Sequence, residues 1–112
     1  MDCLFCKFVS GEFKTDKVYE DEDFIIIRDI EPKAKNHFLA IPKRHFKYLA
    51  EMTEEDGETL GRIFRKIASL QKELGLESGY RLVINQGDAA GQSVPHLHIH
   101  IFSGQKMNWQ PA

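Results

Sequence analysis

Apolar residues recur at helical spacing along one long stretch in the middle of the chain. Thr53 precedes this stretch as a helix N-cap, and the acidic residues at 54–56 favour the first turn of a helix. Gly75 follows the stretch, and glycine commonly ends helices. The pattern therefore predicts one long helix between Thr53 and Gly75. The apolar stripe that it would bury comprises Leu60, Ile63, Phe64, Ile67, Ala68 and Leu74.

Shorter apolar stretches, rich in β-branched residues, predict the strands of a sheet. Pro32 follows the first full stretch and Pro42 ends the second, so we expect these two strands to pair as neighbours. Short helical turns are expected at residues 3–8 and 45–49. Because strands and helices do not alternate, the order predicts an α+β fold with an antiparallel sheet of about five strands, one long helix and one or two short ones. The expected strands begin at residues 18–19 and cover residues 24–28, 37–41, 80–84 and 94–102.

The length and composition of the chain match those of one soluble globular domain, residues 1–112. A formal charge of −2 argues against a protein that binds nucleic acid through a basic face. No apolar run approaches the roughly 20 residues that span a bilayer, and the acidic N-terminus lacks the basic flank of a signal peptide. We therefore expect a cytoplasmic protein that binds neither nucleic acid nor membrane. In that compartment Cys3 and Cys6 are not expected to form a structural disulfide.

Three of the five histidines fall within five residues, at His96, His98 and His100. In a strand their side chains would share one face, while Leu97 and Ile99 would face the core. A simple polar face would mix in threonine, lysine and glutamate, so the composition disfavours that interpretation. One metal ion does not gather all three histidines easily, because the outer pair would lie roughly 13 Å apart and zinc–nitrogen bonds are only about 2.1 Å long. At least one imidazole is therefore left for another role.

Neutral imidazole is a good nucleophile near pH 7 and can attack phosphorus or an acyl carbon to give a covalent intermediate. Neighbouring histidines can hold its tautomer, contact phosphoryl oxygens or pass a proton to the leaving group. The loop before the histidines ends in Gly91, Gln92 and Ser93, which offer backbone amides and a hydroxyl to an anion. Together these residues indicate phosphoryl chemistry and leave the substrate open.

The segment Gly91-Gln-Ser-Val-Pro-His-Leu-His-Ile-His-Ile-Phe102 closely resembles the motif of the histidine-triad (HIT) family, His-x-His-x-His followed by two apolar residues. The resemblance covers nearly the whole chain, and it implies the HIT-like fold. Further segments with counterparts in the family are residues 19–23, 28–32, 37–45, 79–85 and 107–109.

The resemblance implies catalytic roles for four residues. His98 matches the histidine that attacks phosphorus and is transiently nucleotidylated. His100 matches a histidine that contacts the phosphate, and histidine rather than glutamine at this position is typical of the nucleotide-hydrolase and phosphoramidase branch. His37 matches a histidine that supports the triad from the neighbouring strand. Ser93 matches a position that contacts the phosphate.

The resemblance also implies a site for a purine nucleotide of the AMP or GMP type. Asp29 matches a carboxylate that hydrogen-bonds the ribose hydroxyls; by itself it would be interpreted as a turn residue before Pro32. The positions that match phosphate contacts are Asn85, Ser93 and the backbone of Gly91 and Gln92. The positions that match apolar contacts around the base are Phe5, Phe8, Phe13 and Ile30, which would also suit a hydrophobic core.

Cys3 and Cys6 form a Cys-x-x-Cys pair. A redox role would need a thioredoxin-like setting, which the sequence does not indicate. A structural zinc site needs four ligands and therefore two more residues. Some members of the family with this cysteine pair have a Cys₂His₂ arrangement, so the resemblance implies His45 and His96 as the other ligands of a structural zinc ion.

Three functions follow from this reasoning. The first is hydrolysis of nucleoside 5′-phosphoramidates or related adenylates through a nucleotidyl-histidine intermediate. The second is hydrolysis of dinucleoside polyphosphates, with the same nucleophile and a different leaving group. The third is a non-catalytic regulatory module that binds nucleotide or zinc. Met107 and Trp109 resemble a dimer-completing C-terminus, and pairing of two sheets edge to edge would remove an exposed strand edge, so we expect a homodimer.

Overall fold

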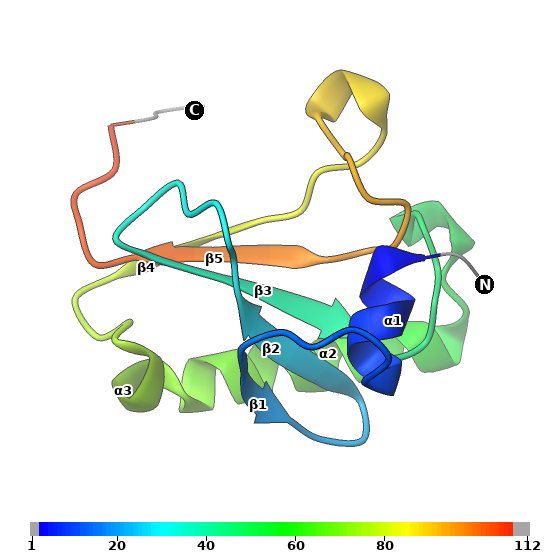
Figure 1. Cartoon of the computed structure of the whole chain (residues 1–112). Helices are drawn as coiled ribbons and strands as arrows, with labels where there is room; N and C mark the ends of the chain where they lie inside the picture. The colour runs from blue at the N-terminus through cyan, green and yellow to red at the C-terminus, as the bar shows by residue number, and fades with distance from the viewer. Residues whose placement is uncertain (1–2, 109–112) are drawn as a thin grey trace.

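The computed structural model describes residues 3–108, which form one antiparallel sheet with helices on both of its faces (Figure 1). The strands lie in the spatial order β1-β2-β3-β5-β4. The predicted α+β fold with five antiparallel strands is therefore confirmed. The strands are β1 (Lys17–Glu20), β2 (Phe24–Arg28), β3 (Asn36–Pro42), β4 (Tyr80–Val83) and β5 (Ile99–Ser103). The helices are α1 (Leu4–Ser10), α2 (Glu54–Ser69) and α3 (Gln71–Leu74), with 3₁₀ turns η1 (Leu49–Glu51) and η2 (Asp88–Ala90).

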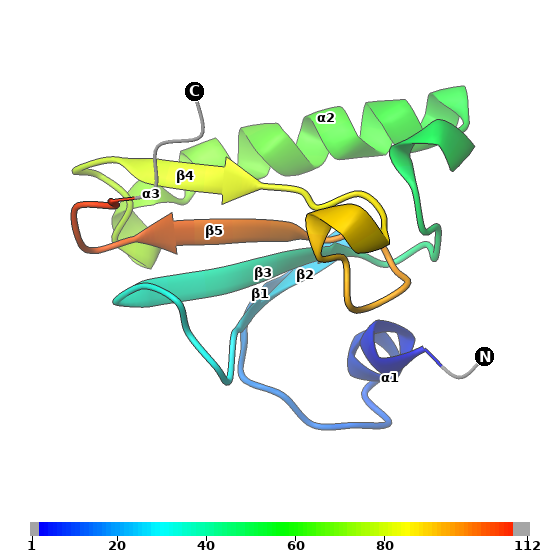
Figure 2. The same cartoon turned by 90° about the horizontal axis from the view of Figure 1, so that it is seen from above.

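Successive side chains of a strand point to opposite faces of the sheet. The central strands are buried on both faces, because residues of α2 pack on one face and residues of α1 on the other. Ile26 and Ala40 pack on one face with Ile63 of α2. Ile27 and Leu39 pack on the other face with residues of α1. Figure 2 shows the two helices on opposite sides of the sheet. His37, His98 and His100 lie on the face of the sheet that α1 covers.

The long helix begins as predicted and ends earlier. The Thr53 side chain accepts from the amide of Asp56, whose carboxylate accepts from the Thr53 amide, so both ends of a capping box are formed. Helix α2 ends at Ser69 with Leu70 as its C-cap, and a separate short α3 follows before Gly75, which has a left-handed φ of 72°. The prediction of one continuous helix is wrong at this break. Phe64, assigned to its buried stripe, is 36% exposed, and Ala68 is also exposed.

The last strand begins at Ile99 rather than at residue 94. Pro95 has no amide to donate, the amide of His96 bonds the Val94 carbonyl, and the amide of Leu97 bonds the Phe46 carbonyl over 2.7 Å. These hydrogen bonds are not part of the pairing between strands. His96 and His98 therefore precede β5, the strand that carries His100. The expected turn at residues 45–49 is also misplaced, because the helical hydrogen bonds occur in η1. Of the helices in the described residues, none is long and apolar enough to cross a membrane.

Candidate functional site

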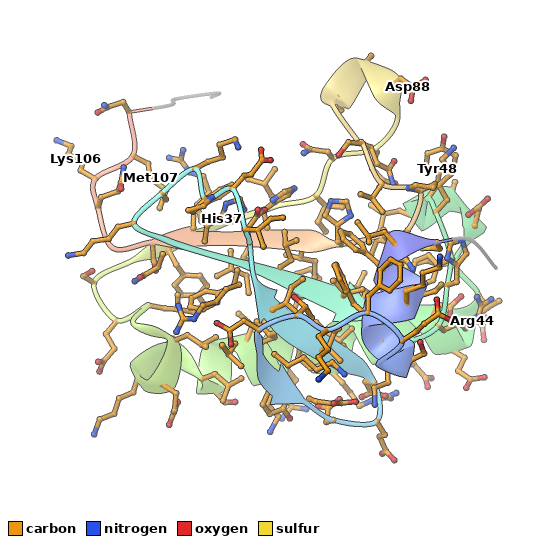
Figure 3. All side chains as sticks on the ribbon, viewed as in Figure 1. His37, Arg44, Tyr48, Asp88, Lys106 and Met107 are labelled. Atoms are coloured by element: carbon orange, nitrogen blue, oxygen red, sulfur yellow. The ribbon has the colours of Figure 1, made fainter. Side chains whose placement is uncertain are left out.

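A cavity of about 540 Å³ opens on the α1 side of the sheet. It is lined by residues of α1, the end of β2, β3, β5 and the loop that follows β4. Figure 3 shows His37 between α1 and the C-terminal segment. The predicted site residues that line the cavity are Phe5, Phe8, Asp29, Ile30, His37, Asn85, Ser93, His98 and His100.

His98 has one tautomer fixed by its surroundings. Its Nδ1 lies 2.8 Å from the backbone carbonyl oxygen of His96. A carbonyl oxygen only accepts, so Nδ1 carries the proton and Nε2 keeps its lone pair. The edge of the Phe5 ring packs against the His98 ring at 4.9 Å between centroids. The imidazole is thus held in position on both sides, with an unprotonated nitrogen available for chemistry.

His37 and His100 form a directed hydrogen-bonded chain. The backbone amide of Lys33 donates to His37 Nδ1 over 3.0 Å, which places the proton of neutral His37 on Nε2. His37 Nε2 lies 3.0 Å from His100 Nδ1 and donates to it. His100 therefore carries its own proton on Nε2. One backbone amide consequently determines which nitrogen of His100 is a donor.

The cavity histidines are neutral at pH 7. Burial lowers the pKa of His100 from 6.5 to about 4, and the nearby imidazoles of His98 and His37 act in the same direction. Burial also lowers the pKa of His98 and of His37 below the ordinary value. Neutral imidazole is the nucleophilic form, so burial keeps the lone pair of His98 available.

Asp29 serves both the turn and the cavity. Its Oδ1 accepts from the amide of Glu31 over 2.8 Å, as expected for a turn residue. Its Oδ2 lies 3.5 Å from His37 Nε2. The structural interpretation and the binding interpretation of this carboxylate are therefore compatible.

The loop residues Gly91 and Gln92 do not line the cavity. The Gly91 amide donates to the Asp88 carbonyl, and the Gln92 amide donates to the Gly87 carbonyl. The Gln92 side chain accepts from the Gly87 amide and donates to the Lys47 carbonyl. In this structure these groups stabilise the loop. Phe13 also lies outside the cavity, 43% exposed, with the Lys7 ammonium over its ring.

Cys3, Cys6, His45 and His96 converge at the N-terminal end of α1. One ligand atom from each of the four lies within 4.8 Å of the others. His96 Nδ1 lies 3.4 Å from Cys3 Sγ and 3.1 Å from His45 Nδ1, and Cys6 Sγ lies 3.2 Å from His45 Nδ1. A tetrahedral zinc ion with ordinary bond lengths holds its ligand atoms roughly 3.3–3.8 Å apart. The four side chains therefore fit a zinc ion.

The tautomer of His96 agrees with that fit. Its Nε2 donates to the Pro42 carbonyl over 2.8 Å, so Nδ1 presents a lone pair to the two sulfurs. Burial lowers the pKa of His96 to about 4, which keeps the ring neutral. Burial and the neighbouring Cys3 raise the pKa of the Cys6 thiol to about 11, so a metal that binds there displaces a proton.

Several groups of the site were not predicted from the sequence. The Lys33 amide and the Pro42 carbonyl fix histidine tautomers through backbone groups, which have no sequence pattern. Further cavity-lining residues without a predicted role are Leu4, Thr15, Ile27, Arg28, Glu31, Lys33, Leu39, Val83, Val94 and Phe102. Alternation along β3 and β5 indicates which of their side chains share the histidine face, and this signal could have found Leu39 and Phe102.

Comparison with known proteins places this geometry in a family. The model of the HIT domain matches residues 10–107. A HIT family hydrolase from Legionella pneumophila is 40% identical, with a TM-score of 0.92, and the match covers 99% of this chain and 100% of that one.

Two further solved structures are similar. A histidine triad nucleotide-binding protein from Candida albicans is 30% identical, with a TM-score of 0.82, over 99% of this chain and 85% of that one. A zinc-bound histidine triad family protein from Mycobacterium smegmatis is 37% identical, with a TM-score of 0.80, over 96% of this chain and 78% of that one. The fold is that of HIT family hydrolases, and the chain belongs to the HIT domain family.

Proposed function

We propose that this chain hydrolyses nucleoside 5′-phosphoramidates or related adenylates through a nucleotidyl intermediate on His98. The observation that carries the proposal is the hydrogen bond from His98 Nδ1 to the His96 carbonyl. It leaves Nε2 unprotonated in a residue that lines the cavity. The similarity to a HIT family hydrolase and to a nucleotide-binding relative supports the same conclusion.

The purine nucleotide, of the AMP or GMP type, binds along the cavity. Phe5, Phe8 and Ile30 contact the base, and Asp29 accepts from the ribose hydroxyls. The phosphate is bound by Asn85, Ser93 and His100. The backbone amides of Gly91 and Gln92 contribute only if the loop releases the hydrogen bonds that they make here.

Hydrolysis proceeds in two displacements. The lone pair of His98 Nε2 forms a bond to the α-phosphorus as the phosphorus–nitrogen bond breaks. The departing nitrogen takes the Nε2 proton of His100, which His37 keeps on that nitrogen, and a proton from solvent replaces it, so this step takes up one proton and leaves His100 neutral. Water then attacks the phosphorus, the bond to His98 breaks, and nucleoside monophosphate leaves. One proton of this water stays on the nucleoside monophosphate and the other returns to solvent, which balances the proton taken up in the first displacement.

In the proposed active protein, a zinc ion is held by Cys3, Cys6, His45 and His96. Its contribution is structural, because it ties α1 to the segment that precedes His98. The zinc-bound relative supports this assignment.

The decisive experiment compares wild type with His98→Ala and His98→Asn on a fluorogenic adenosine phosphoramidate. Both variants are expected to lose turnover while still binding AMP in calorimetry. A labelled adduct on His98 should be trapped by acid quenching of the wild type. Near-normal turnover in either variant overturns the nucleophile assignment, and the lack of any adduct favours a non-catalytic module. Faster turnover of diadenosine polyphosphates than of phosphoramidates favours the second function.

We further propose that residues 1–112 act as one domain in the cytoplasm, as a homodimer. β1 and β4 are the edges of the sheet, and pairing along an edge would cover it. Met107 is half-buried beside the end of the sheet, whereas Trp109 lies outside the described residues. Sedimentation at micromolar concentration tests this, and a monomer mass would contradict it.

A further inference from the structure

A second cavity of about 440 Å³ adjoins the first on the side away from α1. Lys33, Val83 and Phe102 line both cavities, so the two are contiguous. The second cavity also contacts Arg81 and Met107. Figure 3 shows Met107 on the C-terminal segment, beyond His37 as seen from α1.

The pairing of β4 with β5 explains how this cavity meets the histidines. Arg81 is paired with Phe102 and Val83 with His100, so these side chains share one face of the sheet. The Phe102 ring lies parallel to the His100 ring, at 5.6 Å between centroids, and 4.3 Å from the His37 ring. Phe102 therefore forms the boundary between the second cavity and the His37–His100 chain.

The charges of the two cavities differ. Asp29 and Glu31 line the first cavity together with the cations Arg28 and Lys33, so carboxylates and cations are equal in number there. The described residues that line the second include the cations Lys33 and Arg81 and no carboxylate. The Lys33 ammonium donates to the backbone carbonyl of Glu31, which leaves its charge uncompensated by that bond. A group that enters the second cavity therefore lies beside two cationic side chains.

The position of the cavity along the substrate follows from the proposed function, on which this inference rests. The base lies toward α1 and the phosphate at His98 and His100. The leaving group projects past His100, which gives it a proton, and the space there is the second cavity. We propose that the second cavity is the leaving-group subsite and that it selects an amine bearing a carboxylate or phosphate. When the phosphorus–nitrogen bond breaks, this amine departs with the proton from His100, and Lys33 and Arg81 bind its anionic group.

The test uses two adenosine 5′-phosphoramidates that differ only in charge, one made from β-alanine and one from β-alaninamide. We expect kcat/KM for the carboxylate to exceed that for the amide by about tenfold to a hundredfold, the range for hydrogen bonds to charged groups. Lys33→Gln and Arg81→Gln should each reduce this preference, and the double variant should bring the ratio of the two kcat/KM values near one. Lys106→Gln removes a nearby exposed charge outside both cavities and should leave the ratio unchanged.

Equal kcat/KM values for the two substrates in the wild type overturn the subsite, as does a preference that survives the double variant. If neither compound is cleaved, the proposed function fails instead. The subsite is then decided by calorimetry with the same two compounds, because binding needs no turnover. Tighter binding of the carboxylate that is lost in the double variant supports the subsite, and equal dissociation constants overturn it.

Discussion

His98 donates a hydrogen bond to the backbone carbonyl of His96 across 2.8 Å, and this contact connects the cavity to the cysteine–histidine cluster. His96 in turn donates from its own ring to the Pro42 carbonyl. The backbone around His96 is thus fixed by a side chain that also faces Cys3. The orientation of the His98 ring consequently depends on residues that do not line the cavity.

Removal of zinc should weaken nucleotide binding as well as the fold. Chelation, Cys3→Ser or Cys6→Ser should lower zinc content from about one equivalent and reduce AMP affinity, because Leu4, Phe5 and Phe8 of α1 line the cavity. Free zinc at about 100 times its dissociation constant should stabilise the protein by about 2.7 kcal/mol. Metal analysis, thermal melting and calorimetry measure these effects, with Ser10→Ala as the control on α1. Less than about half an equivalent of zinc in fresh protein would count against the site.

His100→Gln should slow the cleavage of substrates whose leaving group needs a proton. We expect kcat for an alkyl phosphoramidate to fall by about 10²–10⁴-fold, the usual contribution of general acid catalysis. A nucleoside 5′-p-nitrophenyl phosphate should be affected much less, because the phenolate leaves without a proton. Equal losses on the two substrates in steady-state kinetics would show that His100 has no role in proton transfer.

The stability of the fold should decrease as pH falls from 7 toward 4. The pKa of His100 is about 4 in the folded protein and near 6.5 unfolded, so between these values the unfolded chain binds the extra proton. His98 and His37 shift in the same direction. Urea midpoints at pH 7 and pH 5 measure the effect. His100→Gln should show a shallower pH dependence, and a slope equal to that of the wild type would contradict the contribution of His100.

Ile63→Ala should destabilise the fold by about 2–5 kcal/mol, because Ile63 of α2 is fully buried against the sheet. The matched control is Arg65→Ala on the exposed side of the same helix, which should change stability by less than about 0.5 kcal/mol. Urea unfolding compares the two. Similar effects would mean that α2 does not pack as described.

Local pattern was sufficient for the elements that determine their own boundaries. Strand β2 covers Phe24–Arg28, as predicted, because an apolar β-branched run lies between turn residues. The Thr53 cap is likewise local. The predicted strand at 94–102 was too long, since the amide of Leu97 bonds a distant carbonyl instead of the sheet.

Part of the candidate site could be predicted because the histidines have a distinctive spacing in the sequence. The spacing of the histidines showed that one metal ion does not gather all three easily, and His96 does lie with the cysteines while His100 lies with His37. Their tautomers were not readable, because they depend on the Pro42 carbonyl and the Lys33 amide, which only the folded chain brings near. The second cavity also escaped prediction, since it needs the register between β4 and β5.

Cys3 and His96 touch although 93 residues separate them in the sequence. A ribosome adding about 5–20 residues per second takes roughly 5 to 20 seconds to make that stretch. The seven-residue α1 is too short to be stable alone, so it forms only when the residues that it packs against have been made. The contact between α1 and the segment that precedes His98 therefore forms only after β1, β2, β3 and β4 have been made.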